Sequence, residues 1–92
     1  MNYRLDYTDK TNKNIEFHKK SGNNPLLKKL FKLLIEISND PYTGSGKPEQ
    51  LKHQLSGLWS RRLNKEHRII YEVLEDTKVV VIHSVKGHYY KK

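Results

Sequence analysis

The chain has 92 residues, and its 18 Lys and Arg against 10 Asp and Glu give a formal net charge of +8. A chain of this length has surface for only one modest hydrophobic core, so we expect residues 1–92 to form a single domain. The absence of cysteine excludes disulfides, thiolate nucleophiles and cysteine-based zinc sites. The positive charge favours binding to nucleic acid or acidic protein segments over binding to an anionic membrane.

No apolar run approaches the ~20 residues that a membrane-spanning helix needs. The first ten residues, MNYRLDYTDK, also lack the apolar core of a signal peptide. We therefore expect a soluble, cytoplasmic protein with no membrane contact.

The first twenty residues predict a strand followed by a helix. "YRLDY" alternates apolar or aromatic residues with polar ones, which predicts a half-exposed strand over residues 3–7. Residues 8–20 follow a helical pattern that is mostly polar, with Ile15 and Phe17 as its only strong hydrophobes. We expect this helix to dock shallowly and to end at "SGNN".

A second helix carries most of the predicted core. Asn24 followed by Pro25 predicts its start, because Asn accepts hydrogen bonds from first-turn amides and proline is tolerated there. Apolar residues recur at spacings of three and four, opposite polar ones: Leu26, Leu27, Leu30, Phe31, Leu33, Leu34 and Ile37 against Lys28, Lys29, Lys32 and Glu36. Pro41 ends the helix, since it disfavours helical geometry at Asp40.

Beyond Pro48 the sequence is strand-like. A short β-like segment at residues 50–55 precedes three apolar segments, at 58–63, 68–74 and 78–85. The separators "NKEH" and "EDT" are short enough for hairpins, which predicts an antiparallel meander. The order of elements indicates an α+β fold, with an N-terminal strand and two helices packed on a mainly antiparallel sheet.

Arginines alternate with apolar residues in the predicted strands. Trp59 and Leu63 point to one face, Arg62 points to the other, and Arg68 repeats this alternation in the next strand. We therefore expect one apolar sheet face and one that displays guanidinium groups. Any single arginine could merely solubilise an exposed face, but the cluster favours phosphate binding.

Glu49 lies beside Lys47 and Lys52 in a region with few acidic residues. A carboxylate among cations keeps its negative charge, and accepts a proton only where the transition state drives the transfer. The alternative is a surface ion pair of little energetic value, and composition alone favours that alternative.

Histidines at positions 18, 53, 67, 83 and 88 can exchange protons near neutral pH, so one close to a bound phosphate would be a natural general acid or base. Metal ligation is the alternative, but no HExxH or comparable spacing is present. We expect His83, within an apolar strand, to be partly buried. His88 follows the last strand, where sequence pattern alone says little about its role.

Aromatic residues lie among the basic ones. We expect Trp59 and Tyr71 to belong to the core. Tyr89 and Tyr90 have lysines on both sides, and aromatic rings beside lysine suit stacking on unpaired RNA bases.

The block GKPEQLKHQLSGLWSRRLNKEHRIIYEV over residues 46–73, with "HY" at 88–89, closely resembles the YoeB family of bacterial toxins. This family lies within the RelE superfamily of ribosome-dependent messenger RNA endonucleases. The contiguous motif is too long to recur by chance. The resemblance implies a microbial-ribonuclease-like (RelE-like) fold and metal-independent, cofactor-free cleavage of mRNA in the A site of the 30S ribosomal subunit.

Site residues follow from the same motif matches. Glu49 matches the general base of the family, Arg68 its phosphate-stabilising arginine and His88 its general acid. Lys52, Arg62 and Tyr89 match further positions that line the RNA site. The C-terminus "VKGHYYKK" departs from the family pattern, because it inserts Gly87 and appends residues 90–92.

The resemblance also implies partners. It predicts a cognate acidic, YefM-like antitoxin, contact with operator DNA only through the antitoxin complex, and leaves a homodimer open. The competing hypothesis is a non-catalytic RNA- or DNA-binding module with the same basic face. Glu49 separates the two, because a pure binder gains nothing from a carboxylate facing phosphate. A degenerate toxin is disfavoured, since all three catalytic residue types are present.

Overall fold

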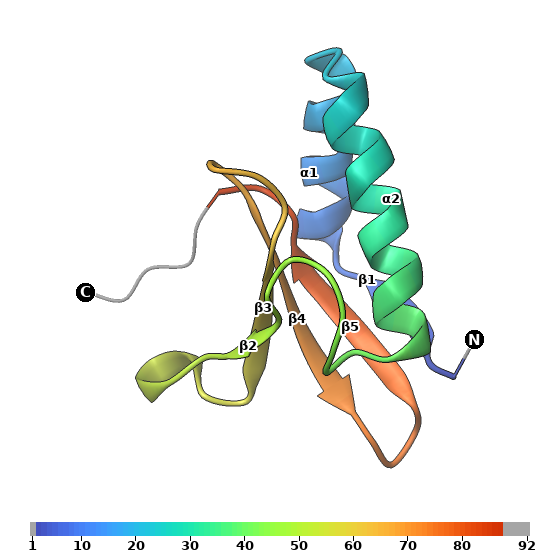
Figure 1. Cartoon of the computed structure of the whole chain (residues 1–92), viewed down its shortest axis with the longest axis vertical. Coiled ribbons are helices and arrows are strands. Elements are labelled where there is room, and N and C mark those ends of the chain that lie inside the picture. Colours follow the sequence, from blue (N-terminus) through green and yellow to red (C-terminus); the bar gives the residue numbers. More distant parts are fainter. Residues whose placement is uncertain (1, 88–92) are drawn as a thin grey trace.

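Five strands form one sheet in the order β1-β5-β4-β3-β2, and two helices pack on it (Figure 1). The computed structural model describes residues 2–87. The elements in chain order are β1 (Arg4–Tyr7), α1 (Asp9–Lys20), α2 (Asn24–Asn39), β2 (Glu49–Gln50), the 3-10 helix η1 (His53–Leu55), β3 (Leu58–Arg62), β4 (Arg68–Leu74) and β5 (Val79–Ser84).

The predicted meander is confirmed, because β3 pairs with β4 and β4 with β5, both antiparallel. β1 lies at one edge of the sheet, parallel to β5. β2 lies at the other edge, antiparallel to β3. The fold is therefore α+β with a mainly antiparallel sheet, as expected.

The first helix, α1, docks through polar residues rather than through its hydrophobes. Thr8 caps its N-terminus by accepting from the Thr11 amide. Thr11 and His18 are buried, whereas Phe17 is half exposed and Ile15 is only partly buried against the core. Of its two strong hydrophobes, only Ile15 packs against the core, and Phe17 does not. Buried polar groups replace it because main-chain carbonyls satisfy them.

The N-terminal cap of α2 is Asn23, whereas the sequence predicted Asn24, which is the first residue of the helix. The Asn23 side chain accepts from the Leu26 amide at 3.2 Å, so Pro25 lies within the first turn. Five apolar residues of its predicted stripe are buried: Leu26, Leu30, Leu33, Leu34 and Ile37. Phe31 departs from the prediction, because it remains exposed on the outer side.

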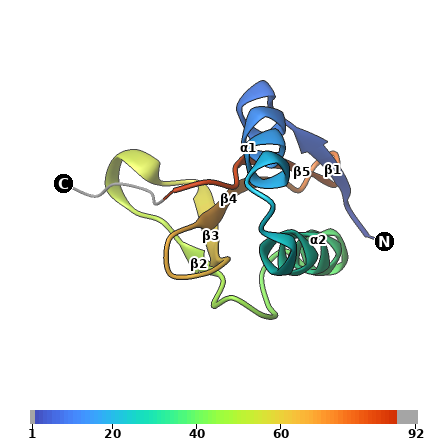
Figure 2. The same ribbon diagram turned by 90° about the horizontal axis from the view of Figure 1, so that it is seen from above.

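Between Pro48 and β3, only Glu49–Gln50 form a strand, so the β-like assignment of residues 50–55 was largely wrong. Leu51 still donates to the Leu58 carbonyl, but His53 adopts a φ of 60° and begins the 3-10 turn. A left-handed residue cannot continue a strand. In both views η1 lies on the side of the molecule away from α2 (Figures 1 and 2).

The core lies between α2 and the face of the sheet that turns toward it. Tyr71, Leu63, Ile69, Val80, Ile82 and Val85 meet the buried stripe of α2, and Trp59 packs at the margin. Tyr71 is thus a core residue, as expected, whereas Trp59 is only partly buried against the core. Among residues 2–87, no helix is long and apolar enough to cross a lipid bilayer.

Candidate active site

The strand register brings Glu49 and two arginines onto the same sheet face. Glu49 pairs with Ser60 across β2 and β3, and Arg62 pairs with Arg68 across β3 and β4. Paired residues share a face, and so do residues two apart on one strand. Glu49, Arg62 and Arg68 therefore occupy neighbouring positions on the face opposite α2. The alternation in the sequence predicted this face for Arg62 and Arg68, and the pairing of β2 with β3 adds Glu49 to it.

These side chains differ in exposure. Glu49 and Arg62 are exposed, and Arg68 is half-buried. Lys52 is exposed at the N-terminal cap of η1, two residues beyond the end of β2. One acidic group is thus accompanied by exposed cations, a combination that suits binding of a phosphodiester.

Arg61 is a buried structural residue beside the candidate site, and sequence reasoning missed its role. It shares the core face with Trp59 and Leu63, and its side chain is 0% exposed. Its guanidinium donates to the main-chain carbonyls of Asp40, Thr43 and Ser45, to Tyr71 Oη and to Glu36 Oε1. Arg61 therefore stabilises the fold and is not available to bind phosphate. The sequence signal for this inward position was the alternation that places Arg61 on the same strand face as Trp59 and Leu63.

The arginine fixes the loop of residues 41–48, which leads directly into Glu49. Glu36 accepts from the Ser45 amide at 2.8 Å, and this bond is the main cause that lowers the pKa of Glu36. Gly46 accepts from the Arg62 amide at 2.7 Å, which anchors the loop to β3. The loop thus places the predicted base relative to the cationic strand.

The chain leaves β5 beside Arg68. The Arg68 amide donates to the Gly87 carbonyl at 2.9 Å, and the Gly87 amide donates to Nδ1 of His67 at 2.9 Å. Gly87 has a φ of 81°, a conformation that glycine adopts without strain. His88 and Tyr89, the predicted acid and its aromatic neighbour, lie outside the described residues.

His83 is half-buried, as expected, and its Nε2 lies 3.1 Å from a carboxylate oxygen of Glu72. Within residues 2–87, no group of three or more His, Asp or Glu is arranged to hold a metal ion.

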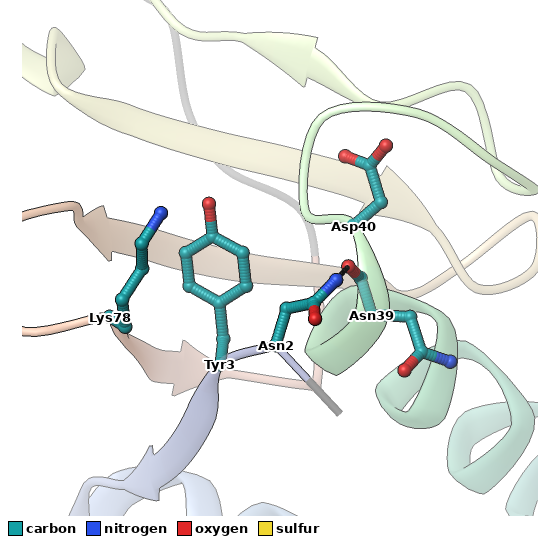
Figure 3. Close-up of a pocket in the computed structure, with 5 residues that line it drawn as sticks. All are labelled: Asn2, Tyr3, Asn39, Asp40 and Lys78. Atoms are coloured by element: carbon teal, nitrogen blue, oxygen red, sulfur yellow. Dashed lines mark hydrogen bonds between the residues drawn. The ribbon is translucent and has the colours of Figure 1, made fainter.

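A separate polar cluster lies at the other end of the sheet. Glu75 accepts from Tyr3 Oη at 2.6 Å, from Lys78 Nζ at 2.8 Å and from Tyr42 Oη. An open pocket beside it is lined by Asn2, Tyr3, Asn39, Asp40 and Lys78 (Figure 3). None of these residues belongs to the predicted site, and the cluster ties β1, the β4–β5 turn and the loop after α2 together.

Comparison with known proteins agrees with this architecture. Residues 7–89 match the YoeB-like toxins of bacterial type II toxin-antitoxin systems. The chain belongs to this family. It is 44% identical to Toxin YoeB of Escherichia coli strain K12 over 64 residues, which are 70% of this chain and 74% of that protein. Toxin YoeB of Streptomyces coelicolor is 39% identical over 72 residues, which are 78% of this chain and 83% of that protein.

Solved structures of YoeB-family toxins superpose on most of the chain. The YoeB/ParE toxin from Agrobacterium tumefaciens has a TM-score of 0.87 at 30% identity, over 94% of this chain and 99% of that one. The YoeB dimer from Staphylococcus aureus has a TM-score of 0.80 at 33% identity, over 97% and 100% of the two chains. A heterotetrameric YoeB-YefM complex from the same organism gives 0.79 at 32% identity, again over 97% and 100%. The fold expected from the family resemblance is confirmed.

Proposed function

We propose that this YoeB-family toxin is an endoribonuclease that cleaves mRNA in the ribosomal A site of bacteria. The observation that carries the proposal is the register that sets Glu49 beside Arg62 and Arg68 on one sheet face. Its site of action is the cytoplasm, where the ribosomes are.

The proposed reaction is a transesterification within the RNA. Glu49 takes the proton of a 2′-hydroxyl, the 2′-oxygen bonds to phosphorus, and the bond from phosphorus to the 5′-oxygen breaks. The products are a 2′,3′-cyclic phosphate and a 5′-hydroxyl. The nucleophile belongs to the substrate, so the protein needs to supply a base, an acid and charge stabilisation. No metal ion or cofactor has a step in this scheme.

Arg68 is proposed to stabilise the charge that develops on the phosphorane, with Arg62 and Lys52 as further phosphate contacts. Preorganised donors of this kind contribute strongly in acyl and phosphoryl transfer. The half-burial of Arg68 supports this role, because a cation held away from bulk water interacts more strongly with developing charge.

His88 is proposed as the general acid that gives a proton to the departing 5′-oxygen, with Tyr89 stacking on the RNA. The support is the motif match together with Gly87, the residue before His88, which is bonded to the Arg68 amide at 2.9 Å. Gly87 therefore lies beside the backbone of Arg68, one of the cationic residues of the proposed site.

A translated message separates this function from a non-catalytic binding module. Purified ribosomes translating a defined mRNA would be incubated with the wild type and with Glu49→Gln, and the new RNA ends mapped and their chemistry determined. We expect A-site cleavage with cyclic phosphate ends for the wild type, also with EDTA at levels that keep ribosomes intact, and none for Glu49→Gln. Undiminished cleavage by Glu49→Gln, or abolition by such EDTA, would contradict the mechanism.

The proposed partner of the free toxin is an acidic, YefM-like antitoxin, with operator DNA reached only through that complex. Support comes from the YoeB-YefM complex of Staphylococcus aureus and from the net charge of +8. Flexible acidic chains are attracted by a basic surface and fold upon it. Self-association into a dimer has a precedent in the YoeB dimer of the same organism.

A further inference from the structure

The three residues that follow β5 are held by three side chains and by one main-chain bond to β4. On α1, Asn14 accepts from the Val85 amide at 3.0 Å, and His18 Nε2 lies 2.8 Å from the Val85 carbonyl oxygen. At Gly87, the amide donates to His67 Nδ1 and the carbonyl accepts from the Arg68 amide. Residues 85–87 are therefore clamped at both ends.

The hydrogen-bond partners determine the protonation of both rings. A carbonyl oxygen only accepts, so the buried His18 carries its proton on Nε2. An amide only donates, so His67 Nδ1 must be unprotonated. The two rings meet edge to face with centroids 4.8 Å apart, which packs His67 against α1.

The backbone of His67 is itself fixed by a tight turn. Asn64 Oδ1 accepts from the Glu66 and His67 amides, and the His67 carbonyl accepts from the Leu63 amide. The ring is mostly buried, with 17% of the side chain exposed. Its Nδ1 is therefore a preorganised acceptor, aimed at the residue immediately before His88.

We propose that His67 is a positioning residue for the cleavage reaction: its unprotonated Nδ1 holds the Gly87 amide and so fixes the point from which the chain enters the proposed acid His88. This inference rests on the proposed function and adds a role that the motif matches do not assign. His67 itself does not exchange a proton with RNA. It acts through the Gly87 amide and the His88 that follows.

The bond can be tested without reference to activity. Long-range proton–nitrogen correlation spectra of the labelled protein would report the tautomer of His67, and amide exchange would report protection of Gly87. We expect an Nε2-protonated ring and a protected Gly87 amide in the wild type. His67→Phe should remove the protection, whereas His67→Asn should keep most of it, because Asn Oδ1 sits where Nδ1 does. Lys65→Gln, two residues before His67 and exposed, is the matched control and should keep it fully.

The positioning role is tested on programmed ribosomes under single turnover. We expect His67→Phe to slow cleavage about 10–100-fold, since a small misplacement of a general acid has effects of that size. His67→Asn should recover most of the rate. The loss should shrink on an mRNA with a 5′-thio leaving group at the scissile phosphate, because a thiolate leaves without a proton. It should also shrink in a His88→Gln background, as expected for residues that act as one unit.

The outcomes separate the two proposals. A wild type that does not cleave mRNA would overturn the proposed function. A His67 ring protonated on Nδ1 would overturn this inference whether or not the protein cleaves. A His67→Phe variant that has lost Gly87 protection yet cleaves at the wild-type rate would overturn the positioning role alone.

Discussion

Arg61 on β3 and Glu36 on α2 form an ion pair, with 3.3 Å between Nη1 and Oε1. The pair lies beneath the loop of residues 41–48, which leads to Glu49. The arginine is fully buried, and the glutamate retains 27% of its side-chain exposure. Buried charges require full hydrogen bonding, and three loop carbonyls and Tyr71 complete the shell around the guanidinium. The pair therefore connects the stability of the fold to the placement of the proposed base.

Replacing Arg61 with Leu should lower the free energy of unfolding by about 2–4 kcal/mol, because several buried acceptors lose their donor. Urea unfolding followed by circular dichroism measures this. Arg62→Leu, at the exposed neighbouring position, is the matched control and should change stability by less than about 0.5 kcal/mol. Equal effects of the two substitutions would show that the loop contacts contribute little.

Gly46 should tolerate alanine far less well than Gly57 does. Both have positive φ, 83° and 94°, so both substitutions carry a backbone penalty of about 1–2 kcal/mol. At Gly46 a Cβ would also lie 2.8 Å from the Arg62 carbonyl oxygen, whereas at Gly57 nothing lies within 4 Å. In thermal unfolding, Gly46→Ala should have a lower melting temperature than Gly57→Ala. Equal melting temperatures would show that the loop relieves the clash at Gly46 without loss of stability.

Element types were predictable wherever hydrophobic periodicity was strong, as in α2 and in the meander from β3 to β5. The parallel pairing of β1 with β5 was not, because it depends on packing between the two ends of the chain. The cap of α2 shifted by one residue because Asn23 and Asn24 are chemically equivalent caps. Burial of Thr11 and His18 was invisible to hydropathy, since each is satisfied by a distant carbonyl.

The face shared by Arg62 and Arg68 was predictable because strand alternation depends only on local geometry. The position of Glu49 on that face was not, because it depends on the pairing of β2 with β3. The same alternation places Arg61 on the core face with Trp59 and Leu63, but its hydrogen-bond partners could not be inferred, because they come from a loop about twenty residues earlier. The hydrogen bond between His67 and Gly87 was equally unpredictable, since a side chain joins two segments that are distant in the sequence.

Acid should weaken the fold partly through Glu75. Hydrogen bonds from Lys78 first, then from Tyr3 and Tyr42, lower the pKa of Glu75 from 4.5 to about 2. A carboxyl with a lowered folded-state pKa stabilises the fold above its unfolded pKa, and that contribution is lost as pH falls from about 5 toward 2. Glu75→Gln should therefore melt lower than the wild type at pH 6, and its melting temperature should fall less steeply between pH 5 and pH 2.

The control for this pH series is Asp76→Asn, the adjacent position in the same turn. The melting temperature of this variant should change with pH as steeply as that of the wild type. The reason is that no hydrogen bond from Tyr3, Tyr42 or Lys78 to Asp76 is found in the part of the chain described. A Glu75→Gln slope as steep as that of the wild type would mean that other carboxyls dominate the acid transition.

Arg68→Ala and His88→Gln should fail differently in mRNA cleavage. Arg68 is proposed to stabilise charge on the phosphorane with any leaving group, so its loss should cost about 2–4 kcal/mol of transition-state stabilisation on all substrates. His88→Gln should be damaging on ordinary RNA and much less so on RNA with a 5′-thio leaving group. Single-turnover rates on both substrates measure this. Equal damage on both would show that His88 is not the acid, and Tyr89 would be the next candidate.

Association with the proposed acidic antitoxin should slow as salt rises, while dissociation changes less. The net charge of +8 attracts an acidic segment at long range, and screening shortens that range to about 10 Å at 0.1 M salt. Between about 0.05 and 0.5 M salt we expect the association rate to fall by about tenfold or more, as for other steered encounters. Stopped-flow fluorescence of Trp59 with a labelled antitoxin segment gives both rates.

The same measurement tests whether the segment folds along the basic sheet face and the C-terminal "GHYYKK". Deleting residues 90–92 removes Lys91 and Lys92, which lowers the formal charge from +8 to +6. Lys28→Ser with Lys29→Ser makes the same change on the exposed side of α2, so both variants should associate more slowly. Only the truncation should also dissociate faster, because it removes contacts as well as charge. An association rate indifferent to salt, or a truncated protein inhibited as tightly as the wild type, would show that neutralisation uses another surface.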